Sequence, residues 1–102
     1  MLRLALLSLL FATPAAAWQE VADLHAFLVG KRIDYPGVSQ AFEASGVTHY
    51  GRTTGAWEVR DGRYCSVWPP ATEWVCYGVD VSGEVIRFTA EDGTTTEGRL
   101  NR

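Results

Sequence analysis

The stretch "GRYCSVWPPATEWVCYGV", residues 62–79, holds both cysteines, two of the four tryptophans and two of the four tyrosines of this 102-residue chain. Its two halves are typical of β-strands, and the "PPAT" segment at 69–72 is typical of a loop between them. If these four residues form the loop, Cys65 lies directly opposite Cys76. A disulfide can join two such cysteines when they form a non-hydrogen-bonded pair, because their Cβ atoms are then close enough.

The strand before this stretch follows from the turn that joins them. Asp61-Gly62 is a strong signal for a two-residue type I′ hairpin turn. With this turn, Trp57 faces Ser66 and Val59 faces Tyr64. The sequence therefore predicts three consecutive antiparallel strands, with the cysteine pair on the central hairpin.

Two further turns extend the sheet toward the C-terminus. Ser82-Gly83, taken as a two-residue turn, makes Val79 face Ile86. A three-residue loop over 91–93 then places Leu100 on the same face as the other apolar residues.

These registers sort the side chains onto two faces, because neighbouring residues of a strand point to opposite sides of the sheet. One face collects the predicted core: Trp57, Val59, Tyr64, Trp68, Val75, Tyr77, Val79, Ile86 and Phe88. The other face collects Glu58, Arg60, Arg63, Val67, Trp74, Arg87 and the disulfide.

The segment from Trp18 to Val29 has the apolar spacing of a helix, with Val21, Leu24 and Leu28 on one stripe. A helix with one apolar stripe is the natural cover for the apolar face of a sheet. We therefore expect an α+β fold: an N-terminal helix packed on an antiparallel β-meander of five to seven strands, able to curl into a half-barrel, with one disulfide.

The first seventeen residues, "MLRLALLSLLFATPAAA", have the pattern of a secretory signal peptide. Arg3 precedes a short apolar run, and small residues of the A-x-A type follow it. We expect residues 1–17 to be removed and residues 18–102 to form a single domain, with no integral membrane segment after cleavage. Export to the periplasm or the medium favours an oxidised cysteine pair, which would stabilise so small a domain.

Composition argues against several function classes. The formal net charge is −3 and no basic stripe is present, so nucleic acid is not an expected partner. His25 and His49 have no second ligand at zinc-binding spacing, and no nucleophile, paired-carboxylate or phosphate-loop motif appears. We therefore expect a protein that is not an enzyme and that has no metal or cofactor.

One group of residues suggests a contact patch. Trp74 is predicted on the outer face near Val67, beside a loop stiffened by Pro69 and Pro70, with Arg63 on the same face. Aromatic residues of this kind often anchor interfaces. Trp74 can also shield the disulfide or pack under a curled sheet, and the sequence leaves both alternatives open.

Two resemblances bear on the family. Gly55-Ala56-Trp57 resembles the Gly-x-Trp motif of lipocalins, but that motif lies in the first of eight strands, and here we expect too few residues after it for such a barrel. The order of parts is more similar to a family of small exported proteobacterial proteins, of the alphaproteobacterial type, with no established function. The matching positions are Gly30, Gly55, Trp57, Asp61, Gly62, Cys65, Trp74, Cys76 and Tyr77.

This second resemblance implies a periplasmic location and little about activity. Together with the residues, it favours a non-catalytic binding or inhibitor-like module that recognises a protein or a small ligand. The alternative is a structural protein of the cell envelope, acting in assembly or stress. The ligand, the partner and the oligomeric state are not predicted.

Overall fold

The structure is a computed structural model that describes residues 17–101, so all of the predicted signal peptide except Ala17 lies outside the described residues. Its elements are β1 (Gln19–Glu20), α2 (Leu24–Leu28), β2 (Arg32–Tyr35), β3 (Val38–Phe42), β4 (Val47–Tyr50), β5 (Thr53–Arg60), β6 (Arg63–Val67), β7 (Val75–Ser82), β8 (Val85–Thr89) and β9 (Thr95–Asn101).

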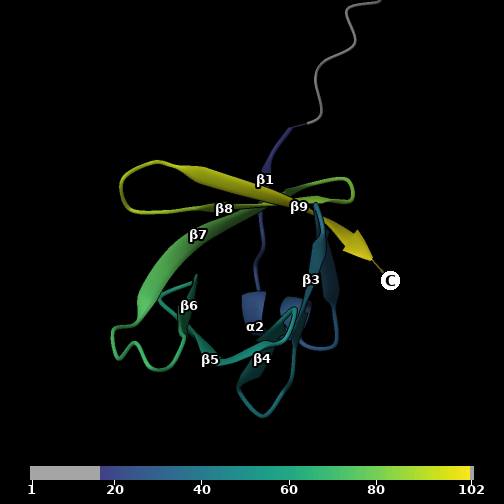
Figure 1. Cartoon of the computed structure of the whole chain (residues 1–102). Coiled ribbons are helices and arrows are strands. Elements are labelled where there is room, and N and C mark those ends of the chain that lie inside the picture. The colour runs from purple at the N-terminus through teal and green to yellow at the C-terminus, as the bar shows by residue number, and fades with distance from the viewer. Residues whose placement is uncertain (1–16, 102) are drawn as a thin grey trace, which may run out of the picture.

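Strands β2 to β9 form a closed antiparallel barrel of eight strands (Figure 1). Each strand pairs with the next along the chain, and β9 returns to pair with β2, with Ile33 opposite Leu100. The predicted α+β fold, with a helix on five to seven strands, is therefore wrong. Closure removes the edges of a twisted sheet, and here it requires β2, β3 and β4, the three short strands that precede the strand of Trp57.

The Gly-x-Trp segment lies in the middle of the barrel rather than at its start. Gly55 and Trp57 belong to β5, with three barrel strands before it and four after it. Too few residues follow this motif for seven more strands, as expected, and the barrel reaches eight strands because three short strands precede the motif.

The helix predicted over 18–29 forms only in the second half of this segment, and a two-residue strand precedes it. Gln19 and Glu20 form β1, which pairs with β7, and only Leu24–Leu28 is helical. The Oδ1 of Asp23 accepts a hydrogen bond from the Ala26 backbone N–H at 3.1 Å, which fixes the helix start at Leu24. The Asp23 cap therefore starts the helix at Leu24, six residues after the start that the apolar spacing predicted.

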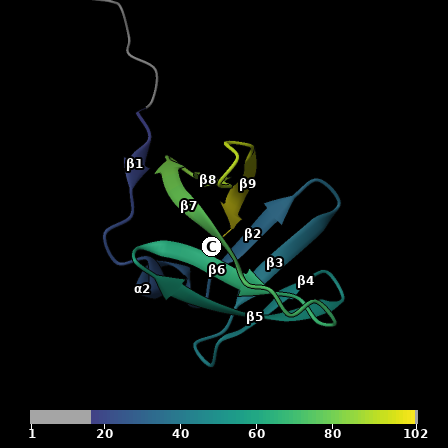
Figure 2. The same cartoon turned by 90° about the vertical axis from the view of Figure 1, so that its left-hand side faces the viewer.

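The short helix α2 covers one end of the barrel. Figure 1 shows it at the centre of the ring of strands, and Figure 2 places it at one end, beside β5 and β6. Leu24 and Leu28 are buried in the core, and the ring of His25 stacks on Trp57 at 5.1 Å. Within residues 17–101, no helix has the length and apolar character needed to cross a membrane.

The central hairpins have the registers that the turn residues predict. Trp57 lies opposite Ser66, and Cys65 lies opposite Cys76. The two sulfurs form the expected disulfide, and the Cα atoms are 4.0 Å apart, the closer of the two spacings in an antiparallel ladder. Asp61 and Gly62 have φ angles of 51° and 74°, as a type I′ turn requires.

The register between β7 and β8 differs from the prediction. Val79 lies opposite Phe88, not Ile86, because the turn residues are Gly83 and Glu84. Gly83 has a φ of 61°, and a type II′ turn takes glycine at its first central position, which moves the turn by one residue. The shift leaves each residue on its predicted face, and the predicted register of β8 and β9 is confirmed.

The barrel interior contains most of the predicted core. Trp57, Tyr64, Ile86 and Leu100 are buried, but Val75 is 47% exposed because β7 begins there, at the rim of the barrel.

Candidate functional site

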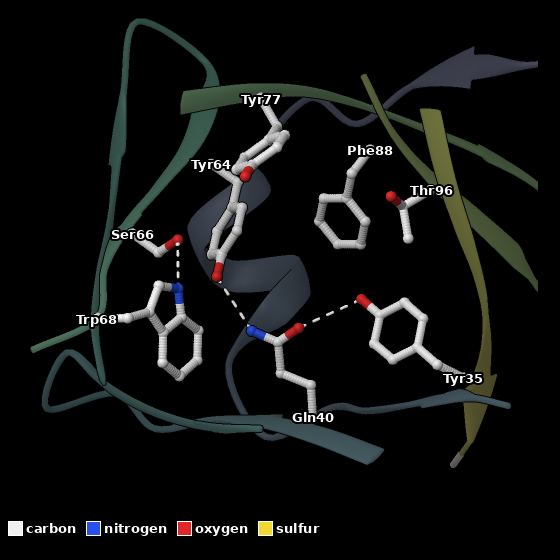
Figure 3. Close-up of a pocket in the computed structure, with 8 residues that line it drawn as sticks. All are labelled: Tyr35, Gln40, Tyr64, Ser66, Trp68, Tyr77, Phe88 and Thr96. Carbon is white, nitrogen blue, oxygen red and sulfur yellow. Dashed lines mark hydrogen bonds between the residues drawn. The ribbon is translucent and has the colours of Figure 1, made fainter. Parts of the chain in front are cut away.

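The side chains inside the barrel leave a partly open cavity of about 140 Å³. Its lining comes from six strands and from the residue that follows β6 (Figure 3). The eight lining residues are Tyr35, Gln40, Tyr64, Ser66, Trp68, Tyr77, Phe88 and Thr96. Five of them are aromatic, and the other three carry a hydroxyl or an amide. Figure 3 shows α2 behind these residues, on the side of the cavity that faces away from the viewer.

The buried side-chain amide of Gln40 links lining residues from several strands. The Nε2 of Gln40 donates to Tyr64 Oη and Thr48 Oγ1, each at 3.0 Å, and its Oε1 accepts from Tyr35 Oη at 3.2 Å. These bonds join β2, β3, β4 and β6 across the barrel. The Thr48 hydroxyl in turn donates to the backbone carbonyl of Ala41 at 2.8 Å. A buried network with every partner supplied holds its members in one geometry.

Tyr64 is the centre of the aromatic wall. Its ring stacks on Tyr77 with centroids 6.0 Å apart, and it meets Phe88 and Phe42 edge to face at 5.4 and 5.7 Å. Each such pair contributes about 0.5–1.5 kcal/mol beyond area burial. The wall is therefore part of the core as well as a lining of the cavity.

Trp68 is held against a glycine. A Cβ at Gly55 would lie 2.6 Å from Cε3 of Trp68 and 2.7 Å from the carbonyl oxygen of Val67. The absence of a side chain at Gly55 is what lets the indole lie across β5. The indole Nε1 then donates to Ser66 Oγ at 3.1 Å.

Tyr35 is held in the same manner on the other side of the barrel. A Cβ at Gly98 would lie 2.5 Å from Cγ2 of Ile33 and 2.8 Å from Cε1 of Tyr35. Gly98 is buried in β9, next to β2 in the ladder that closes the barrel. Two aromatic residues of the lining therefore depend on two strand glycines for their position.

Tyr50 forms an aromatic lip beside the cavity. It is 41% exposed at the end of β4, and its ring lies 5.7 Å from that of Tyr35 and 6.2 Å from that of Trp68. Both neighbours line the cavity, so a molecule entering between them would also meet Tyr50.

The cavity lining is uncharged. None of the eight lining residues bears a charge at neutral pH. Burial, with smaller contributions from Tyr64 and Tyr50, raises the pKa of Tyr35 well above its usual value. Burial likewise raises the pKa of Tyr64, although hydrogen bonds from Ser66 and Gln40 oppose this. Both phenols therefore stay protonated throughout the physiological range.

The residues of the predicted contact patch lie outside this cavity. Trp74 is half-buried, and the guanidinium of Arg60 lies 4.8 Å from the centre of its ring. Arg63 donates to the carbonyl of Cys76 at 3.3 Å. Pro69 and Pro70 are exposed and joined by a cis peptide bond.

Val67, the remaining member of the patch, is half-buried. Its backbone carbonyl lies beside Gly55, the glycine that accommodates Trp68. The predicted role of the patch in recognition stays a prediction.

A second, wider groove of about 670 Å³ lies on the outside of the barrel, between β1 and the turn that joins β5 to β6. Arg63, Asp80 and Arg87 are among its lining residues. Arg87 donates to Asp80 at 2.9 Å, and its guanidinium stacks on the ring of Trp18 at 4.0 Å. Glu20 and Asp61 also line the groove, so its lining carries charges of both signs.

His49 forms hydrogen bonds with Glu43 and Thr54 on the surface, and these three residues are called the surface relay below. Its Nε2 lies 2.8 Å from Oε2 of Glu43, and its Nδ1 lies 3.3 Å from Oγ1 of Thr54. The hydrogen bonds from His49 and Ser45 lower the pKa of the Glu43 carboxyl. All three relay residues lie outside both cavities. Over the part of the chain that the structure describes, no cluster of three or more His, Cys, Asp or Glu side chains could hold a metal ion.

The sequence identified four of the aromatic lining residues only as core, and the other four lining residues were missed: Tyr35, Gln40, Ser66 and Thr96. One signal was available, because Gln40 interrupts the alternating apolar positions Val38 and Phe42. A glutamine in such a place is either an exposed residue or a buried group with partners. The partners lie on other strands, so the pattern alone could not separate the two cases.

No family model, curated protein or solved structure matches this chain. The resemblance to small exported proteobacterial proteins therefore stays a prediction.

Proposed function

We propose that this protein is a non-catalytic binding module that holds a small organic ligand in the cavity inside its barrel. One observation carries the proposal: six strands direct aromatic side chains and a few polar groups to one cavity, where Gly55 and Gly98 make room for Trp68 and Tyr35. Ligand sites in proteins are typically concave and mostly apolar, with a few well-placed polar groups.

The size of the cavity limits the ligand. Its volume of about 140 Å³ is close to that of an engineered apolar cavity that binds benzene, about 150 Å³. It is smaller than a typical drug-sized site, about 300–1,000 Å³. The cavity therefore suits a single ring with a short substituent, or one end of a longer molecule that leaves past Tyr50.

The proposed location is the periplasm or the extracellular space. The signal-peptide pattern of residues 1–17 and the Cys65–Cys76 disulfide both favour an oxidising compartment. Recognition of a protein by the Trp74 patch and a structural role in the cell envelope stay as predictions from the sequence. No contact among residues 17–101 favours either over ligand binding.

Four tryptophan indoles give a direct test. We would record the indole N–H signals of residues 18–102 by NMR while adding a panel of charged and uncharged single-ring and aliphatic compounds. We expect at least one compound to shift the indole of Trp68, which lines the cavity, and to leave that of Trp74 unchanged. A dissociation constant of about 1 mM or lower is reasonable for so few atoms.

A matched pair of variants places the ligand. Thr96→Phe should fill the cavity and abolish the Trp68 shift, whereas Thr95→Phe puts the same ring on the opposite face and should leave binding intact. If no compound moves the Trp68 signal, the proposal is wrong. A shift of Trp74 alone would move the binding site to the sequence-predicted patch.

A further inference from the structure

We infer that the cavity selects an uncharged ring-shaped ligand and excludes ions of either sign. This inference rests on the proposed function, and it names the chemical class that the same site would accept. It follows from the charges and ring contacts of the lining.

Anions find no counter-charge in the cavity. Lysine, arginine and histidine are absent from the eight lining residues. Transfer of an unpaired carboxylate out of water costs far more than such a cavity can return. The faces of aromatic rings are also electron-rich and repel negative charge.

Cations are the stronger competitors, because clusters of aromatic rings can hold quaternary ammonium groups through cation–π contacts. Such a contact needs a free ring face. Here Tyr64 stacks on Tyr77 and meets Phe88 and Phe42 edge to face, so other rings already occupy much of the surface of Tyr64. No carboxylate lines the cavity to balance a positive charge.

The polar groups of the lining suit an uncharged partner. Both nitrogen and oxygen of the Gln40 amide are already engaged with Tyr64, Thr48 and Tyr35. The hydroxyl of Ser66 already bonds Trp68 and Tyr64, whereas the Thr96 hydroxyl, which also lines the cavity, can rotate to donate or to accept. A neutral ring that carries one hydroxyl or similar group therefore matches the site.

Three compounds with one benzene ring test the inference: benzyl alcohol, benzoate and benzylammonium. They have similar shapes, and at pH 7 their charges are zero, negative and positive. We expect benzyl alcohol to shift the Trp68 indole with a dissociation constant at least about tenfold lower than that of either ion. Thr96→Phe should abolish this binding, and Thr95→Phe should preserve it.

A charge added at the rim provides a second test that does not disturb the buried network. Thr96 is exposed at its position in β9, so Thr96→Asp should fold. We expect this variant to improve the affinity for benzylammonium relative to benzyl alcohol by about tenfold. Thr95→Asp, on the outer face, should leave the ratio unchanged.

The outcomes separate the inference from the proposed function. If either ion binds as tightly as benzyl alcohol, the selectivity inference is wrong and ligand binding stands. If none of the three binds but aliphatic compounds of the panel shift Trp68, the ring-shaped class is wrong and ligand binding again stands. If no compound shifts Trp68, both are wrong.

Discussion

Substitution of Gly55 by alanine should displace Trp68 from the cavity wall. The new Cβ would lie 2.6 Å from the indole Cε3 and 2.7 Å from the backbone oxygen of Val67. Carbon atoms in contact prefer about 3.5–4.0 Å, so the side chain or the strand must move by about 1 Å. Because one of the obstacles is backbone, rotation of the indole alone does not relieve the contact.

The loss of folding stability in Gly55→Ala can be estimated from similar cases of overpacking. Extra methyl groups in a well-packed interior destabilise by about 1–3 kcal/mol. Gly78 supplies the matched control, because it lies in β7 and a Cβ there would have no heavy atom within 4 Å. A glycine-to-alanine change at such a position stabilises by about 0.4–1 kcal/mol.

Urea denaturation of the two variants measures the difference. With an m value of about 1 kcal/mol/M, the midpoint of Gly55→Ala should fall by about 1–3 M while that of Gly78→Ala holds or rises. The indole signal of Trp68 should move in Gly55→Ala alone, and that variant should lose ligand binding. Equal midpoints, with an unchanged Trp68 signal, would refute the role assigned to Gly55.

Three further predictions concern the disulfide and two titrating groups. Replacing Cys65 and Cys76 together by serine should cost about 3 kcal/mol in urea denaturation, because the cysteines are 11 residues apart; a loss under about 1 kcal/mol would contradict this. Burial raises the pKa of Tyr35, so the protonated phenol stabilises the folded state fully below the unfolded pKa of about 10. This stabilisation is lost as the pH rises beyond that value. Tyr35→Phe should therefore flatten the alkaline decline in stability, and an unchanged slope would count against burial of the phenol. Hydrogen bonds to Asp34, first of all from the Ser39 hydroxyl, lower the pKa of its carboxyl. The ionised carboxylate therefore stabilises the folded state above the unfolded pKa of 3.8, and this stabilisation is lost as the pH falls below that value. Asp34→Asn should weaken the acid dependence of the midpoint, and a curve parallel to that of the native protein would exclude the effect.

Local sequence signals were reliable where one turn determined one register. Asp61-Gly62 predicted the pairing of Trp57 with Ser66, and the loop after Trp68 predicted the disulfide. The turn at Gly83 failed by one residue, because either position of a two-residue turn can carry glycine and only the backbone φ distinguishes them.

The helix prediction failed for a different reason. The apolar spacing from Val21 to Leu28 is real, and Leu24 and Leu28 are buried. Yet Gln19 and Glu20 pair with β7, and this pairing depends on residues 60 or more positions later in the chain. Spacing within a segment carries no information about such a distant partner.

The sequence by itself determined which residues face inward along each hairpin and that the two cysteines meet, because alternation and turn chemistry act between neighbours in the chain. Only the tertiary structure decided that the sheet closes, since closure depends on β9 finding β2, with Leu100 beside Ile33. The cavity is a product of that closure. Tyr35, Gln40 and Tyr64 line one space only because the ring of strands brings them together.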